Sequence, residues 1–112
     1  MLSKKYRLEA KYLPGIYKEG KKFRGEYGML VVKPLDIENP RFAFVVSKKV
    51  GNSVQRHRMT RLLRQITHEY IKEMNIDDQR LGCQYIAFKY ADKYEELKKE
   101  YSEQIKKAFS IT

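Results

Sequence analysis

The stretch Ser47–Arg64, SKKVGNSVQRHRMTRLLR, combines dense positive charge with the spacing of an amphipathic helix. It contains six Lys or Arg residues and no Asp or Glu, and the first acidic residue after it is Glu69. A helix that needed only a solvated face would mix both signs, because opposite charges four residues apart add about 0.2–0.5 kcal/mol each. Cations near the N-terminal end of a helix are also unfavourable. The charge is therefore expected to bind a polyanion.

A long helix is predicted to begin after the turn residues Gly51-Asn52-Ser53 and to end near Met74, just before Asn75. At about 100° per residue its apolar residues occupy an arc of about 120°, the usual width of a core-facing stripe. These residues are Met59, Leu62, Leu63, Ile66, Tyr70 and Met74. The opposite side carries His57, Arg58, Arg61, Arg64, Gln65, His68 and Lys72. The apolar side is predicted to pack against the core, and the basic side to be exposed to a partner.

Runs of β-branched and aromatic residues predict strands before and after this helix. They cover residues 27–33, 41–47 and 83–90, with a more charged edge strand at 21–26. The segment Pro34–Pro40 is predicted to be a hairpin loop, and Pro14-Gly15 to interrupt any regular element near the N-terminus.

A last helix is predicted from the spacing of Tyr94, Leu97, Tyr101, Ile105 and Ala108. A crossover helix between the third and last strands gives an α/β (α+β) sandwich with helices on a small mixed sheet. The expected element order is α-β-β-β-α-β-α, in a single domain over residues 1–112.

The net charge of +10 is unevenly distributed along the chain. Residues 1–64 hold sixteen Lys or Arg and five Asp or Glu, whereas residues 65–112 hold eight and nine. The first part therefore carries +11 and the second −1. A basic surface in the first part favours a nucleic-acid partner.

A reducing, cytoplasmic location is expected, because Cys83 is the only cysteine and no intrachain disulfide can form. The N-terminus lacks the apolar region of a signal peptide, and no apolar run approaches the ~20 residues that span a membrane.

No catalytic residue and no metal site is predicted in the chain. His57 and His68 lie eleven positions apart, outside the i,i+4 spacing of a helical metal pair. An independent nuclease would need clustered acids to hold magnesium or a histidine pair for acid–base chemistry. The acids of the basic half are only scattered: Glu9, Glu19, Glu26, Asp36 and Glu38. Any chemistry is expected to come from a partner.

The motifs Ser47-Lys-Lys-Val-Gly-Asn52, Arg56-His57-Arg58 and Arg61-Leu-Leu-Arg64 resemble the signature SKKxGxAVxRNRxKRxxR of the bacterial ribonuclease P protein family. The resemblance extends over about residues 6–109. It implies a basic protein that binds a catalytic RNA, which removes the 5′ leader of precursor tRNA with Mg²⁺ ions held through the RNA. It also implies a ribosomal protein S5 domain 2-like fold with a left-handed βαβ crossover. It implies no membrane partner and no stable protein partner.

The resemblance further implies the residues that contact RNA. The catalytic RNA is expected at Lys48, Lys49, Gly51, Asn52, Arg56, His57, Arg58, Arg61 and Arg64. Arginine suits this task because its planar guanidinium can bind phosphate through two hydrogen bonds. Gly51 and Asn52 have an equally good explanation as a turn and a helix cap. The leader is expected in a cleft between the sheet and the first and signature helices, lined by Tyr12, Leu13, Tyr17 and Phe42.

The chain departs from the family pattern at four positions. His57 stands where the family has asparagine, and Thr60 where it usually has lysine. Leu13 and Val31 stand where aromatic residues are common. RNA docking is therefore better supported than contact with the leader.

Two other functions fit the basic helix. A general or ribosomal RNA-binding protein with a related fold would bind RNA without affecting cleavage of precursor tRNA. A DNA-binding protein that inserts the helix into the major groove would favour a helix-turn-helix pattern, which the flanking strands argue against.

Overall fold

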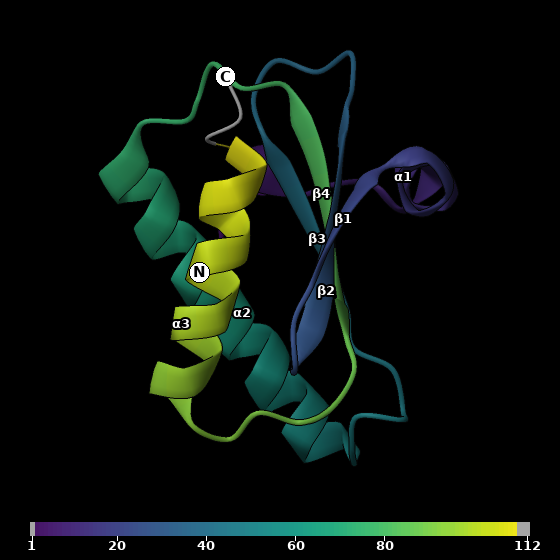
Figure 1. The fold of residues 1–112 in the computed structure, drawn as a ribbon, viewed down its shortest axis with the longest axis vertical. Helices are drawn as coiled ribbons and strands as arrows, with labels where there is room; N and C mark the ends of the chain where they lie inside the picture. The colour runs from purple at the N-terminus through teal and green to yellow at the C-terminus, as the bar shows by residue number, and fades with distance from the viewer. Residues whose placement is uncertain (1, 110–112) are drawn as a thin grey trace.

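The computed structural model describes residues 2–109, which form a four-stranded sheet with helices on both faces (Figure 1). The elements are α1 (Leu13–Glu19), β1 (Lys21–Arg24), β2 (Gly28–Pro34), β3 (Arg41–Val45), α2 (Ser53–Met74), β4 (Leu81–Ala87) and α3 (Tyr94–Phe109). Short 3-10 turns at Lys4–Tyr6 and Ala10–Tyr12 precede them. The predicted α-β-β-β-α-β-α order and the α+β class are confirmed.

The strand order in the sheet is β1-β2-β4-β3. β2 is antiparallel to both β1 and β4, whereas β3 and β4 are parallel and joined through α2. The prediction that Pro34–Pro40 forms a hairpin loop is therefore wrong, because β4 lies between the two strands that this loop connects. β4 is buried along most of its length, as expected for an inner strand that is covered on both faces.

The prediction that Pro14-Gly15 interrupts regular structure is also wrong, because both residues lie within α1. Pro14 occupies the first turn of the helix, where a missing N–H removes no helical hydrogen bond and the fixed φ angle is suitable. The helix buries Ile16 against the sheet. Proline here begins a helix.

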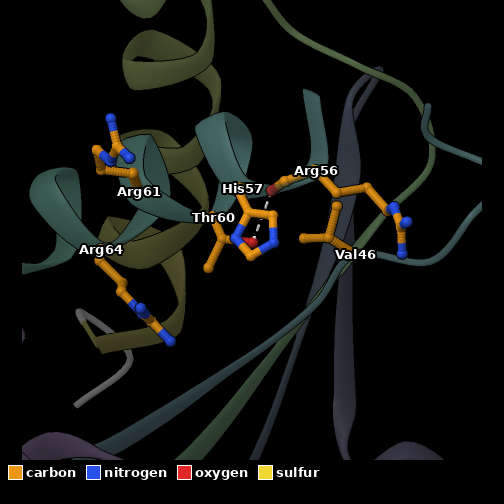
Figure 2. A pocket seen from close by; sticks show the side chains of 6 residues that line it. All are labelled: Val46, Arg56, His57, Thr60, Arg61 and Arg64. Carbon is orange, nitrogen blue, oxygen red and sulfur yellow. Dashed lines mark hydrogen bonds between the residues drawn. The ribbon is translucent and has the colours of Figure 1, made fainter. Parts of the chain in front are cut away.

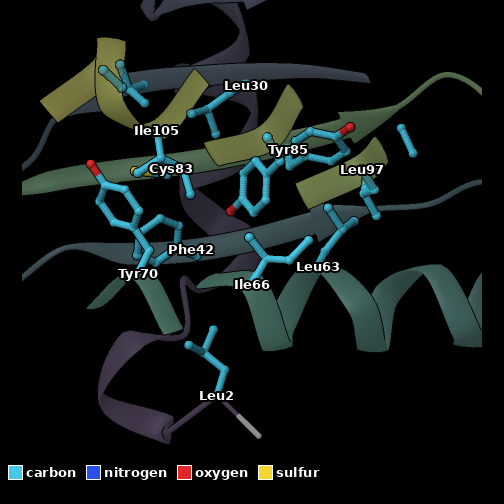
Figure 3. Packing of buried hydrophobic residues seen from close by; sticks show 14 of the residues in the cluster. Leu2, Leu30, Phe42, Leu63, Ile66, Tyr70, Cys83, Tyr85, Leu97 and Ile105 are labelled. Atoms are coloured by element: carbon cyan, nitrogen blue, oxygen red, sulfur yellow. The ribbon is translucent and has the colours of Figure 1, made fainter. Parts of the chain in front are cut away.

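The two faces of the sheet are covered differently (Figure 1). α2 and α3 pack on one face and enclose the main core, in which Leu63, Ile66, Tyr85, Leu97 and Ile105 are buried (Figure 3). α1 packs on the other face, which we call the α1 face, over a smaller cluster. That cluster consists of Leu8, Ile16, Met29 and Val31. The main core fixes the position of α2.

The stripe predicted for α2 is buried at Met59, Leu63, Ile66 and Tyr70 and partly buried at Leu62. Met74 is an exception, with 47% of its surface exposed. The chain reverses at Asn75, which has a φ angle of 48°, and Ile76 packs in the core instead.

Thr67 also belongs to the buried side of α2. Its hydroxyl lies 2.8 Å from the Leu63 carbonyl oxygen and 2.8 Å from the Tyr101 hydroxyl. Because these bonds satisfy its polar group, a threonine is tolerated inside the core.

No helix that the structure describes is long and apolar enough to cross a membrane.

Asn52 caps the N-terminus of α2, as predicted. The Gln55 N–H donates to Asn52 Oδ1 at 2.9 Å, and the Asn52 N–H donates to Gln55 Oε1 at 3.0 Å. A Cβ atom on Gly51 would overlap the Gln55 side chain, so glycine leaves the space that this reciprocal cap occupies.

Asn52→Ala should lower the free energy of unfolding by about 1 kcal/mol, because it removes the cap acceptor. Denaturant unfolding followed by circular dichroism measures the change. Ser53→Ala is the matched control, since the exposed Ser53 side chain makes no hydrogen bond in the described chain, and its effect should stay within about 0.5 kcal/mol. Equal losses in the two variants would contradict the capping role.

Candidate nucleic-acid interface

The exposed side of α2 forms a basic pocket of about 460 Å³ (Figure 2). Arg56, His57, Thr60, Arg61 and Arg64 line it from the helix, and Val46 lines it from the segment after β3. Residues four positions apart on a helix lie on the same side, which brings these side chains together. In Figure 2, His57 and Thr60 lie between Arg56 and Arg64. Three of the four predicted arginines, Arg56, Arg61 and Arg64, therefore share one surface.

The arginines of the basic pocket have no acidic partners. Salt bridges elsewhere join lysines to acids, as in Lys33–Glu19 at 2.9 Å and Lys89–Glu26 at 2.7 Å. Within residues 2–109, Arg56, Arg61 and Arg64 form no salt bridge, and the buried Arg56 Nε has no hydrogen-bond partner. Such unpaired guanidinium groups are suited to bind phosphates.

Glu69, the first acid after the basic stretch, is held by α3 instead. The Tyr94 hydroxyl donates to Glu69 Oε1 at 2.7 Å, and Lys98 Nζ lies 3.5 Å from the same carboxylate. The Tyr94 hydrogen bond is the largest cause that lowers the pKa of Glu69. These contacts hold the Glu69 carboxylate between α2 and α3, so it does not neutralise the arginines of the basic pocket.

Thr60 does not present its hydroxyl to a partner in this arrangement. Its Oγ1 donates to the Arg56 carbonyl oxygen at 2.9 Å (Figure 2). His57 is exposed beside it and shares the wall of the basic pocket. The two departures from the family pattern thus lie among the arginines, where a lysine and an asparagine would add hydrogen-bond donors.

Arg58 and the two predicted lysines lie outside the basic pocket. The Arg58 guanidinium donates to the Asp92 carbonyl oxygen at 3.3 Å, which links the start of α2 to the segment before α3. Lys48 and Lys49 are exposed in the turn that precedes α2. The structure thus brings together four of the nine residues predicted to bind RNA in one pocket and places the others around the helix start.

The structural role of Gly51 and Asn52 is clear from the helix cap. Because Gln55 and Asn52 use each other's backbone N–H groups, those two donors are already occupied. A phosphate at the helix start would have only the remaining free amides. Contact of Gly51 or Asn52 with RNA stays a prediction.

Three of the four residues predicted for the leader lie on or near the α1 face. Tyr12 and Leu13 are partly buried and pack against its apolar cluster. Tyr17 is 51% exposed, and Lys22 Nζ lies 5.1 Å from the centroid of its ring. An exposed ring with a nearby cation is suited to stack on a base beside a phosphate.

The prediction for Phe42 is wrong. This residue is 3% exposed and lies in the main core, where its ring packs edge-on against Phe109 with centroids 6.1 Å apart. Strand alternation places Phe42 on the same side of β3 as Phe44, which packs on Tyr101 of α3. Phe42 therefore faces away from α1.

Sequence reasoning missed other residues of the α1 face. Ile86 and Phe88 pack against its cluster, and the Arg24 guanidinium lies 4.9 Å from the centroid of the Phe88 ring. The alternation in Cys83-Gln-Tyr-Ile-Ala-Phe88 is a signal for this side, since every second residue points the same way.

No group of three or more His, Cys, Asp or Glu residues that fits a metal ion occurs in the described part of the chain.

Comparison with known proteins gives a consistent result. The model of the family described as Ribonuclease P matches residues 2–109. Among curated relatives named "Ribonuclease P protein component", that of Lachnoclostridium phytofermentans is 46% identical over 50 residues, which cover 45% of this chain and 43% of the relative. That of Syntrophomonas wolfei is 34% identical over 71 residues, or 62% and 60% of the two chains. The alignments thus span about half the length of these relatives.

Solved structures share the fold at low sequence identity. The ribonuclease P protein of Thermotoga maritima has a TM-score of 0.73 at 18% identity, covering 90% of this chain and 96% of that one. The Staphylococcus aureus protein, solved at 2.0 Å, has a TM-score of 0.77 at 20% identity, with 92% and 94% covered. The element order and the mixed sheet described above are therefore those of a known fold.

Proposed function

Because this chain belongs to the ribonuclease P protein family, we propose that it binds the catalytic RNA of ribonuclease P and assists removal of the 5′ leader from precursor tRNA. The proposal includes a cytoplasmic holoenzyme in which the RNA is the catalyst. The chain contributes binding and orientation, and none of its residues is assigned to bond cleavage.

The observation that carries this proposal is the set of unpaired arginines on α2. Arg56, Arg61 and Arg64 line one pocket and form no salt bridge in the described chain. The other side of the same helix is buried in the main core, so the arginines are held on a rigid element. Charge-assisted hydrogen bonds from these groups to RNA phosphates would fix how the protein sits on the RNA.

The α1 face lies on the other side of the sheet from α3 and is the proposed path of the leader (Figure 1). Tyr17 is exposed there, with Lys22 beside its ring. Stacking of unpaired bases on such rings is worth roughly 1–3 kcal/mol per base. By holding the leader, the protein would bind precursor tRNA more tightly than mature tRNA, which has no leader.

Magnesium enters the proposal through the RNA. Mg²⁺ binds oxygen ligands and phosphates and would supply charge stabilisation at the cleaved phosphodiester. The cations of the protein reduce repulsion between the RNA and its substrate, so fewer magnesium ions would be needed for the same affinity.

The test is cleavage of a precursor tRNA by the catalytic RNA with and without the purified chain. We expect the chain to lower the magnesium concentration needed for half-maximal cleavage. Tight RNA binding without any effect on cleavage would instead indicate a general RNA-binding protein. Stronger competition by duplex DNA than by structured RNA would indicate a DNA-binding protein and would contradict the proposal.

A further inference from the structure

His57 is a histidine in the wall of the basic pocket, where the other ionisable residues are arginines. Its side chain is exposed, and within residues 2–109 it makes no hydrogen bond and no salt bridge. Figure 2 shows the imidazole beside Thr60, between Arg56 and Arg64. The ring is therefore placed to contact the same partner as the arginines.

The charged groups around His57 are cationic on each element that borders the basic pocket. They are Arg56, Arg61 and Arg64 of α2, Lys48 and Lys49 in the turn that leads into α2, and Arg7 of the N-terminal segment, which lines a smaller adjoining pocket together with Arg64. The segment after β3 adds the apolar side chain of Val46.

No acidic residue of the described chain lines the basic pocket. Glu69, the first acid after the arginines on α2, accepts a hydrogen bond from Tyr94 of α3. Asp92 precedes α3, and its carbonyl oxygen accepts from Arg58, which lies outside the pocket. An anion that meets His57 must therefore come from a partner.

The imidazole of histidine gains a positive charge and a second N–H donor when it is protonated. Phosphate oxygens only accept hydrogen bonds, so the protonated ring suits them and the acceptor nitrogen of the neutral ring does not. Histidine has an ordinary pKa of about 6.5, so a nearby phosphate can favour its protonation close to neutral pH. Thr60 offers no alternative donor, because its hydroxyl donates to the Arg56 carbonyl oxygen.

We propose that His57 binds a phosphate of the catalytic RNA as the imidazolium ion, so that docking takes up a proton from solvent and strengthens as the pH falls. The inference rests on the proposed function and adds a proton-linked contact to it. An asparagine, which the family has at this position, carries no charge at any pH. The proton uptake would therefore be a property of this chain.

The sign of the effect follows from the two states of the protein. Where the ring is protonated only in the complex, binding takes up a proton and lowering the pH raises the affinity. At higher pH the ring is neutral in both states and the contact is lost. At lower pH the ring is protonated in both states, so the affinity gains nothing further from it.

The experiment measures binding of the full chain to the catalytic RNA between pH 8 and pH 6, at constant salt and magnesium and without substrate. We expect the affinity of the wild-type chain to rise roughly five- to tenfold over this range, as for one charge-assisted hydrogen bond. His57→Asn should lack this rise. Because both proteins bind the same RNA, the difference between their curves excludes titration of the RNA itself.

Calorimetry counts the protons directly. Titrations at one pH in two buffers that differ in ionisation enthalpy give the number of protons taken up on binding. The wild-type chain should take up more than His57→Asn by a substantial fraction of one proton. His57→Lys places a fixed cation at the same position and should bind about as tightly at pH 8 as at pH 6.

His68→Asn is the matched control, because His68 lies eleven positions further along α2. At 1.5 Å per residue this is about 16 Å, beyond the screening length of about 8 Å at physiological ionic strength. His68 also lines a different pocket, with Tyr6 and Asp77. The His68→Asn variant should keep the pH dependence of the wild-type chain.

The same pH dependence in wild type and His57→Asn would overturn the assignment of His57, as would its loss in His68→Asn. Weaker binding of His57→Asn at every pH with an unchanged proton count would also overturn it, since that result describes a neutral contact. The proposed function survives all three results and fails only when the wild-type chain does not assist cleavage. The two conclusions are therefore tested separately.

Discussion

Replacing Arg61 and Arg64 together by alanine should weaken binding of the catalytic RNA by about 100-fold or more. Each residue offers an unpaired guanidinium on the exposed side of α2, and a hydrogen bond to a charged group is worth roughly 1.5–3 kcal/mol. Two such losses amount to at least about two decades in affinity. Filter binding or fluorescence titration at several salt concentrations measures both the affinity and its salt dependence.

The salt dependence identifies the kind of interaction. The slope of log affinity against log salt should decrease by about 0.7–0.9 for each phosphate that the variant no longer neutralises. Lys106→Ala with Lys107→Ala is the control, because both lysines are exposed in the last turn of α3 and their removal lowers the net charge equally. Equal weakening by the two double variants would show that only overall charge matters and would contradict the specific role of α2.

Tyr101→Ala should lower the free energy of unfolding by about 3–5 kcal/mol, the usual cost of removing a large ring from a core. Tyr101 is fully buried, and its ring lies 5.0 Å from that of Tyr85 and 6.4 Å from that of Phe44. It therefore joins α3 to β4 and β3, and its loss leaves a cavity beneath α2. Urea unfolding at constant pH gives the value.

Tyr101→Phe separates the ring from the hydroxyl. The variant keeps the packing and loses the bond to Thr67, which can still donate to the Leu63 carbonyl oxygen. We expect a loss of about 1 kcal/mol. A Tyr101→Ala variant as stable as Tyr101→Phe would show that the ring contributes little, contrary to the packing described.

The limits of α2 could be predicted because their signals are local. Asn52 caps its start and Asn75 ends it in the left-handed conformation, within a few residues of where the pattern of apolar residues begins and stops. The same pattern separated the arginines from the core, which the basic pocket confirms. Spacing along one helix is enough to determine which side chains share a side.

Strand pairing could not be predicted in the same way, because it depends on contacts between distant segments. β2 and β3 are neighbours in sequence, yet each pairs with β4. The error at Phe42 has a related cause, since an aromatic residue in a strand fits either face until the covering helices are known.

The central position of β4 has a consequence for synthesis of the chain. β4 is the last strand to leave the ribosome, and without it β2 and β3 have no strand between them. A nascent chain that ends after α2 holds a two-stranded β1–β2 hairpin, which is marginally stable in water by itself. The apolar stripe of α2 then has no complete sheet to cover. Truncated products should consequently lack an ordered arginine surface and keep only the non-specific attraction of their charge for RNA.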